Sequence, residues 1–296
     1  MMKSTSYGLK TVILMVLLSL VLLDVSNSFT TTTTQHQNQQ RSMSMMPLFA
    51  AKIPSSKADR DNQAIAAIKS AIKKPRFTEM KLVECEFPPL VQLNKLGDGS
   101  LRSAKEAENA NIDFVAKLVQ SLAQFSFMGM GPKINIMLSS STSKSFYANL
   151  KSKVKGNVNI YSLKDKNDYN NENDIFIFVT PTSSNDYKMA QKLASSSSKN
   201  NVILINGFAK DTKSIPGTAT MGYFLKPLTY NSQIAGYLIR SYPSDWTVLD
   251  AFTKQVLGTF TDNDILVSKT NTPDLRASGK LVQSAVDQRA ILERQR

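Results

Sequence analysis

The sequence predicts an α/β fold: a Rossmann-like, largely parallel sheet flanked by helices, with an antiparallel meander towards the C-terminus. Between residues 134 and 207, short β-branched runs alternate with amphipathic stretches, which is the pattern of βαβ units. DIFIFVT at 174–180 is apolar almost throughout, as expected for a strand covered on both faces. After residue 217, strand-like segments follow one another with only short turns between them, which favours antiparallel pairing.

The first predicted elements precede the parallel part. DNQAIAAIKSAIKK at 61–74 carries isoleucines at helical spacing and predicts a helix. KLVECEFP at 81–88 alternates as a strand does, and LGDGS at 96–100 has the composition of a turn. Residues 103–125 repeat apolar positions at helical spacing and predict the longest amphipathic helix.

The remaining elements follow from the same periodicities. The parallel part contains, in order, a strand at 134–138, a helix within 139–153, strands at 157–163 and 174–180, a helix at 185–194 and a strand at 201–207. The meander contains ATMGYFLKPL (219–228), AGYLIRSY (235–242), WTVLDAF (246–252) and DILVSKT (264–270). Residues 274–296 predict a basic C-terminal helix in which Leu281, Ala285 and Leu292 align, and whose end either frays or docks on a partner.

Two targeting segments precede the domain. Residues 11–23 are an apolar run of thirteen, shorter than the about 20 residues of a membrane span and typical of a signal-peptide core. The tract that follows is rich in Ser, Thr and Gln and contains no acid until Asp59, which is typical of a transit peptide. We therefore predict a signal peptide at 1–28, a transit peptide at 29–57 and one α/β domain at 58–296.

The tandem of these segments resembles the bipartite plastid presequence of algae with secondary plastids, in which a phenylalanine directly follows the signal-peptide cleavage point. Cleavage between Ser28 and Phe29 would leave that residue first. An ordinary secreted protein with a polar N-terminus and a retained signal anchor are the alternatives. The resemblance implies a plastid location.

The chain is basic, with a formal net charge of +13. Removal of residues 1–57 takes away five bases and one acid, which leaves +9 for the mature domain. Such a charge favours encounters with an anionic membrane, nucleic acid or an acidic protein. No dense basic run is interleaved with aromatic residues, so we do not expect nucleic-acid binding.

Histidine and cysteine are too scarce for several kinds of chemistry. The only histidine, His36, lies in the presequence, which excludes histidine-based nucleophile activation and histidine metal ligands from the domain. Cys85 is the only cysteine, so it forms no intrachain disulfide and no multi-cysteine metal site. Its place in an alternating strand predicts a small core residue. We expect no metal and no cofactor.

Hydroxyl-rich turns follow two of the predicted parallel strands. Ser140, Ser141 and Lys144 come after the strand at 134–138, and Thr182 and Ser183 come after the next apolar strand. Ligands of α/β sheets bind at the carboxyl ends of the strands, where helix N-termini favour anions. These residues are weak candidates for binding a nucleotide or phosphometabolite, because the turns lack the glycines that permit close approach. Helix capping by serine, with a proline turn at Pro181, explains them without a ligand and is the preferred interpretation.

The only tryptophan lies in RSYPSDWTVLD, at a predicted hairpin corner. The cluster consists of Arg240, Tyr242, Pro243 and Trp246, and Pro243 ends one strand. A guanidinium over the indole would contribute about 0.5 to 2 kcal/mol, so packing alone explains the cluster. We expect a structural role, with partner or ligand binding as the alternative.

A family resemblance rests on the order of several segments. They are VECEFPPL, INIML, NDIFIFVTPTSSNDYKMAQKLA, NVILINGF, GYFLKPL and GYLIRSYPSDWTVL. Together, over about residues 61–252, they resemble the plastid and cyanobacterial domain of unknown function numbered nineteen ninety-five. The best markers are the strand ends at Pro181 and Asn206 and the cluster from Arg240 to Trp246. The resemblance implies a plastid protein. One branch of the family includes the low photosystem II accumulation protein three, and for this branch the resemblance implies help in assembling photosystem II. Another branch is fused to a chloroplast adenylate kinase. The resemblance supplies no catalytic residues.

The function we expect is that of a non-enzymatic plastid auxiliary factor, stromal or peripherally attached to thylakoids. Its partner would be a plastid protein such as a photosystem subunit. The alternative is a nucleotide- or phosphometabolite-binding enzyme or regulator that uses the crevice at the strand ends. The sequence does not determine the oligomeric state.

Overall fold

The computed structural model describes residues 51–73, 82–88, 104–123, 132–164, 174–207, 219–267 and 272–295. The chain divides into the units Met1–Met46 and Pro47–Arg296, and every described residue belongs to the second. The predicted signal peptide, its cleavage point at Ser28 and Phe29, and the turn at 96–100 lie outside the described residues. Ala51 and Ile53 pack against the core, while the transit-peptide boundary at residue 57 stays a prediction.

The described strands form a nine-stranded mixed sheet in the order β3-β2-β4-β5-β1-β6-β7-β8-β9. Neighbours from β3 to β6 pair in parallel, and β6 to β9 pair antiparallel, which confirms the predicted fold class. The bounds are β1 (Leu82–Glu86), β2 (Ile134–Leu138), β3 (Val158–Ser162), β4 (Ile175–Val179), β5 (Asn201–Ile205), β6 (Thr220–Tyr230), β7 (Gln233–Ser241), β8 (Trp246–Asp250) and β9 (Val256–Phe260).

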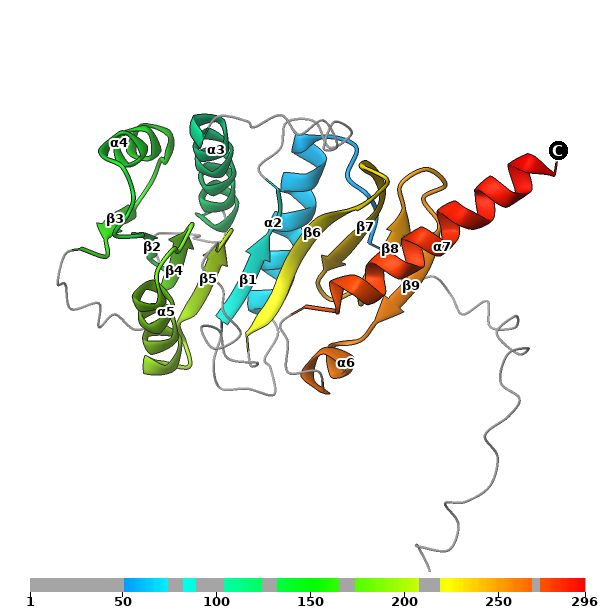
Figure 1. Cartoon of the computed structure of the whole chain (residues 1–296). Helices are drawn as coiled ribbons and strands as arrows, with labels where there is room; N and C mark the ends of the chain where they lie inside the picture. Colours follow the sequence, from blue (N-terminus) through cyan, green and yellow to red (C-terminus); the bar gives the residue numbers. More distant parts are fainter. Residues whose placement is uncertain are drawn as a thin grey trace, which may run out of the picture. The chain divides into compact units, whose positions relative to one another are not determined.

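Helices cover both faces of the sheet (Figure 1). One face packs against α2 (Lys57–Lys73), α3 (Ala104–Ala123) and α4 (Lys144–Lys153) in the largest core cluster. On the opposite face, α5 (Ser184–Ser196) covers the parallel strands, while α7 (Leu275–Arg294) and the short α6 (Asp262–Val267) cover the antiparallel ones. Because both faces are covered, every residue of β2 and β4 is buried.

The neighbours β2 and β4 form the point where the chain changes direction within the sheet. From β2 the chain enters α4 on one face, whereas from β4 it enters α5 on the other. The two loops therefore leave the same sheet edge in opposite directions. In open α/β sheets, such a topological switch point is where a ligand crevice forms.

Two details of the predicted meander are wrong. DILVSKT was expected as a strand, but Asp264 to Val267 belong to α6. The backbone N–H and hydroxyl of Thr261 donate to the Asp264 carboxylate at 2.7 and 2.8 Å, and the Asp264 N–H donates back to the Thr261 hydroxyl at 3.3 Å. These reciprocal bonds start a helix. The last strand is instead β9, which pairs with β8.

Candidate functional site

The hydroxyl-rich loops after β2 and β4 meet at the switch point. The register pairs Leu138 with Val179, so both strands end at the same level of the sheet. The Thr182 hydroxyl lies 2.9 Å from that of Ser141 and 2.8 Å from that of Ser139. The structure thus brings the predicted residues Ser141 and Thr182 together across the two loops.

A buried carboxylate organises this hydroxyl cluster. Asp186 is 2% exposed and accepts hydrogen bonds from the Ser139 hydroxyl at 2.7 Å and from the backbone N–H groups of Thr182 and Ser183 at 2.9 and 3.1 Å. Because the single hydroxyl proton of Ser139 goes to the carboxylate, Thr182 donates to Ser139. Hydrogen bonds therefore run from the exposed loop surface at Thr182 to the buried Asp186.

The carboxylate also determines which ligands the cluster suits. Helix N-termini bind anions through backbone N–H groups that have no partner within the helix. At α5, Ser183 and Asp186 form a capping box, and the Asp186 side chain already occupies this position. At α4, Ser143 caps the helix by accepting from the Phe146 N–H at 3.1 Å. A phosphate at the N-terminus of α5 would therefore meet the Asp186 carboxylate at the N–H groups that it would have to bind.

Two other predicted residues lie beside the cluster without joining it. Ser140 is half-buried in the loop after β2, and Lys144 is the exposed first residue of α4. The hydrogen bonds among Ser139, Ser141, Thr182 and Asp186 include neither side chain.

Strand ends next to the cluster adopt left-handed backbone conformations. Thr180 and Asn206, which follow β4 and β5, both have φ of 48°. Asn206 tolerates this conformation well, and its buried amide accepts from the Phe87 N–H and donates to Asn111 Oδ1, both at 2.8 Å. Thr180 is β-branched, so its conformation is strained and is held by the bond from its N–H to the Ile205 carbonyl at 2.8 Å.

The predicted hairpin corner buries Arg240 and Trp246, while Tyr242 is half-buried and Pro243 is exposed. Arg240 and Trp246 are each 1% exposed, and the guanidinium lies 6.0 Å from the indole ring. Asp262 joins them: its Oδ2 accepts from Arg240 Nη2 at 2.7 Å and its Oδ1 from Trp246 Nε1 at 3.3 Å. Tyr242 adds its ring 5.7 Å from the guanidinium, and the bond between Tyr242 and Pro243 is cis. The structure brings all four predicted residues into one corner.

Apolar side chains are exposed on the last turns of α7 and on the segment from the turn after β8 to the start of β9. Phe252 is 82% exposed, Val256 56%, Ile291 54% and Leu292 60%; we call these four residues the α7 surface. Arg289 lies 5.8 Å from the Phe252 ring, which places Phe252 beside the last turns of the helix. Figure 1 shows these turns extending past the strands.

An ion pair fixes α7 beside this surface. Arg289 donates to Asp250, whose side chain is 1% exposed at the end of β8. Burial raises the pKa of Asp250, but hydrogen bonds from Arg289 and from the N–H groups of Thr253 and Phe252 outweigh burial and lower the pKa below its usual value. The carboxylate is therefore held ionised, and it anchors both the helix and the turn that carries Phe252.

Among the described residues, His, Cys, Asp and Glu form no group of three or more that could hold a metal ion. No helix in the described part of the chain is long and apolar enough to cross a membrane.

The chain matches the model of a known family. The model of the family Domain of unknown function (DUF1995) matches residues 54–261. The chain belongs to this family. The DUF1995 region contains the hydroxyl cluster and the corner at Arg240, and it ends before α6 and α7. No curated protein and no solved structure matches the chain. The predicted family is thereby confirmed, while the link to a photosystem II assembly branch stays a prediction.

Proposed function

We propose that the protein is a non-enzymatic plastid auxiliary factor that binds a protein partner through the α7 surface. The observation that supports this best is the exposure of Phe252, at 82%, beside Arg289 of α7, whose last turns also expose Ile291 and Leu292. Large exposed apolar side chains that gather in a patch mark interaction sites on soluble proteins. The helix is anchored by the pair between Arg289 and Asp250, so little ordering is needed when a partner binds.

A groove beside Phe252 suits one inserted side chain of the partner. It has a volume of about 300 Å³ and lies between the turn of the β6–β7 hairpin, the turn after β8 and α7. Ile234, Ala251, Phe252 and Val286 give it apolar walls, and Arg289 and Glu293 give it charged edges. Interfaces concentrate their binding energy where an aromatic or aliphatic anchor fills such a pocket.

The plastid location and the kind of partner rest on the sequence. The tandem of signal and transit segments at 1–57 supports import into a plastid. Membership of DUF1995, together with the resemblance described above, supports a photosystem subunit or assembly intermediate as the partner, met in the stroma or at the thylakoid surface.

The test is cross-linking in isolated plastids followed by identification of the neighbours. Phe252→Ser combined with Leu292→Ser should abolish recovery of the neighbour bound by the unchanged chain, without lowering the melting temperature, because both side chains are exposed. Tyr147→Ser, which also removes an exposed apolar side chain but from α4 on the opposite face, should leave recovery unchanged. Recovery of the same neighbour by the Phe252 and Leu292 variant would refute the proposal.

The hydroxyl cluster supports a second candidate, binding of a small polar ligand at the switch point. Asp186 disfavours a phosphate there, so a neutral hydroxylated compound fits better than a nucleotide phosphate. Thermal shift measurements with nucleotides, S-adenosylmethionine, sugars and sugar phosphates test this candidate. A shift with sugars that Thr182→Val removes would support it, and the absence of any shift would exclude these ligand classes.

A further inference from the structure

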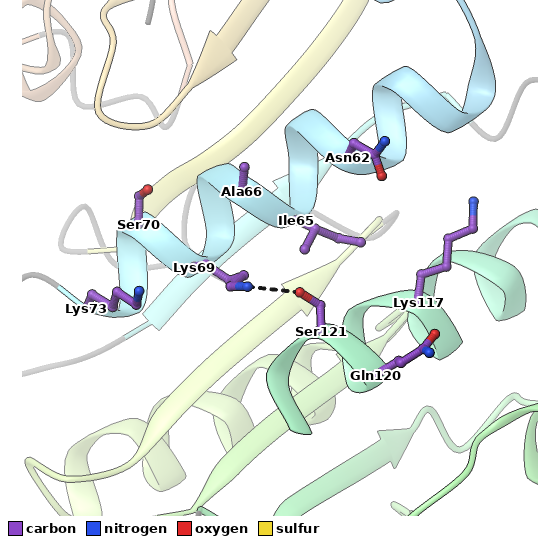
Figure 2. Close-up of a pocket in the computed structure, with 9 residues that line it drawn as sticks. All are labelled: Asn62, Ile65, Ala66, Lys69, Ser70, Lys73, Lys117, Gln120 and Ser121. Carbon is purple, nitrogen blue, oxygen red and sulfur yellow. Dashed lines mark hydrogen bonds between the residues drawn. The ribbon is translucent and has the colours of Figure 1, made fainter. Parts of the chain in front are cut away.

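A basic groove lies between α2 and α3, on the face of the sheet opposite α7. It has a volume of about 580 Å³, and Figure 2 shows the side chains that line it. Lys69 and Lys73 come from α2, and Lys117 comes from α3. None of the nine lining residues carries a carboxylate. The groove is therefore an electropositive surface formed by the sides of two helices.

An ion cluster around the buried Asp61 lies behind the groove. The Asp61 side chain is fully buried and accepts from Lys117 Nζ at 2.7 Å and from Arg60 Nη2 at 2.6 Å. Lys117 is already one of the lining lysines and the charges of Arg60 and Asp61 cancel, so the cluster leaves the net positive charge of the groove unchanged.

The donors are placed so that one anion can contact several of them. Lys69 and Lys73 are four residues apart on α2 and therefore project from the same side of the helix. Lys69 Nζ donates to the Ser121 hydroxyl at 3.1 Å, which holds its ammonium group towards α3 (Figure 2). The lining also includes the hydroxyl of Ser70 and the amide of Gln120. Two like charges at this spacing repel each other, and an oxyanion bound between them removes that repulsion.

We propose that this groove binds a phosphate or sulfonate group of a small ligand. Lys69 and Lys73 are its charged partners, and the Ser121 hydroxyl beside Lys69 is a neutral donor. Ile65 adds an apolar side chain that can contact the carbon chain of such a ligand. The same chemistry is found in a free phosphate ester and in the headgroup of an anionic lipid, and the experiment separates the two.

The test compares two double variants of the full chain. Lys69→Gln with Lys73→Gln removes the proposed charged contacts. Lys188→Gln with Lys192→Gln removes two exposed lysines at the same spacing from α5, on the opposite face of the sheet. The probes are glycerol 3-phosphate in calorimetry, and sedimentation with phosphatidylcholine vesicles that contain or lack phosphatidylglycerol. We expect the Lys69 and Lys73 variant to bind about tenfold more weakly or worse, and the α5 variant to bind as the unchanged chain does.

Each outcome decides the proposal. Lysine-dependent binding of glycerol 3-phosphate supports a soluble ester, and lysine-dependent binding of the anionic vesicles alone supports a lipid headgroup. Absence of binding to both probes, or an equal loss in both double variants, overturns the proposal. Ser70→Asp, which places a negative charge in the groove without removing a lysine, should weaken binding as well and serves if the lysine variant does not fold. Because the α7 surface is untouched in these variants, failure here leaves the proposed partner surface intact.

Discussion

The carboxylate of Asp262 decides how the corner at the end of β7 is stabilised. Arg240 brings a positive charge to a position that is 1% exposed, and a buried charge is costly unless it is paired. Asp262, whose side chain is 58% exposed, supplies the partner at 2.7 Å. The same carboxylate accepts from the Trp246 indole, so one surface residue satisfies two buried donors.

Replacement of Trp246 by alanine should lower the free energy of unfolding by about 3 to 5 kcal/mol. The ring is 1% exposed and packs on Phe224, with ring centroids 5.2 Å apart, so its removal leaves a cavity in the core under α7. Urea denaturation of the variant measures the change. A loss below about 1 kcal/mol would contradict the packing role.

Replacement of Asp262 by alanine should cost about 2 to 3 kcal/mol, because the buried guanidinium loses its closest carboxylate. Asp245→Ala is the matched control: Asp245 is equally exposed, at 59%, but lies 3.9 Å from the guanidinium. The control should cost less than about 1 kcal/mol, because its carboxylate is solvated and too far from the guanidinium for a hydrogen bond. Equal losses in the two variants would show that Asp262 is not the main partner of Arg240.

Helix α7 approaches the antiparallel strands closely at two glycines. A Cβ at Gly236 of β7 would lie 2.5 Å from Val282 Cγ2 and 2.8 Å from the Leu249 carbonyl oxygen. A Cβ at Gly258 of β9 would meet the end of the Leu281 side chain at 2.7 Å. Leu281, the neighbour of Gly258, is a flexible side-chain end that can turn away. The neighbours of Gly236 cannot move as easily, because Val282 is buried and the Leu249 carbonyl belongs to the sheet.

Gly236→Ala should therefore destabilise the protein by about 1 to 3 kcal/mol, as overpacked core positions do. Gly258→Ala should cost clearly less, since Leu281 can adopt another rotamer. Denaturation midpoints of the two variants, measured side by side, provide the comparison. A larger loss of stability in Gly258→Ala than in Gly236→Ala would contradict the inference that α7 packs most tightly where Val282 meets Gly236.

The elements that the sequence predicts correctly are those whose pattern is local. Strands such as INIML and IFIFV are recognisable because sheets covered on both faces require unbroken apolar runs. DILV has the same composition but forms a helix, because Thr261 and Asp264 cap it. The strand VLGTF of β9 was not predicted, because it is short and contains a glycine. It adopts the strand conformation because it pairs with β8, and this pairing is not visible in the local sequence.

The sequence predicted which loops form the candidate site, but not the hydrogen bonds within it. Parallel βα units place successive loops at one edge, so Ser141 and Thr182 could be expected near each other. The organising role of Asp186 could not, because its bond to Ser139 joins loops from different strands. Asp186 does, however, lie three residues after Ser183, which is the spacing of a capping box. This spacing could have predicted that Asp186 bonds to the backbone at the start of the helix.

At the scale of the whole molecule, carboxylates link separate helices of the same layer. Asp113 of α3 accepts from Lys57 of α2 and Lys153 of α4. Burial raises the pKa of Asp113, but the bonds from Lys153 and Lys57 outweigh burial and lower it. Together with Asp250, which anchors α7, this carboxylate couples the attachment of both helical layers to pH.

Stability should accordingly be flat from about pH 5 to 8 and should fall on acidification below about pH 4. Asp113 and Asp250 have folded-state pKa values below the unfolded value, so their contribution is fully present above the unfolded pKa of about 3.9 and is lost as the pH falls through the folded pKa. Urea denaturation midpoints measured as a function of pH provide the test.

The flat region follows from the absence of histidine beyond residue 36, since histidine is the side chain that ordinarily titrates there. On the alkaline side, burial raises the pKa of Tyr223 and Tyr237 above the usual value, so stability should decline again above about pH 10. Asp250→Asn should make the acid limb shallower, because one of the two carboxylates that take up a proton on unfolding is gone while Asp113 remains. A steep change in stability between about pH 6 and 7 would show that a group other than these carboxylates and tyrosines controls folding.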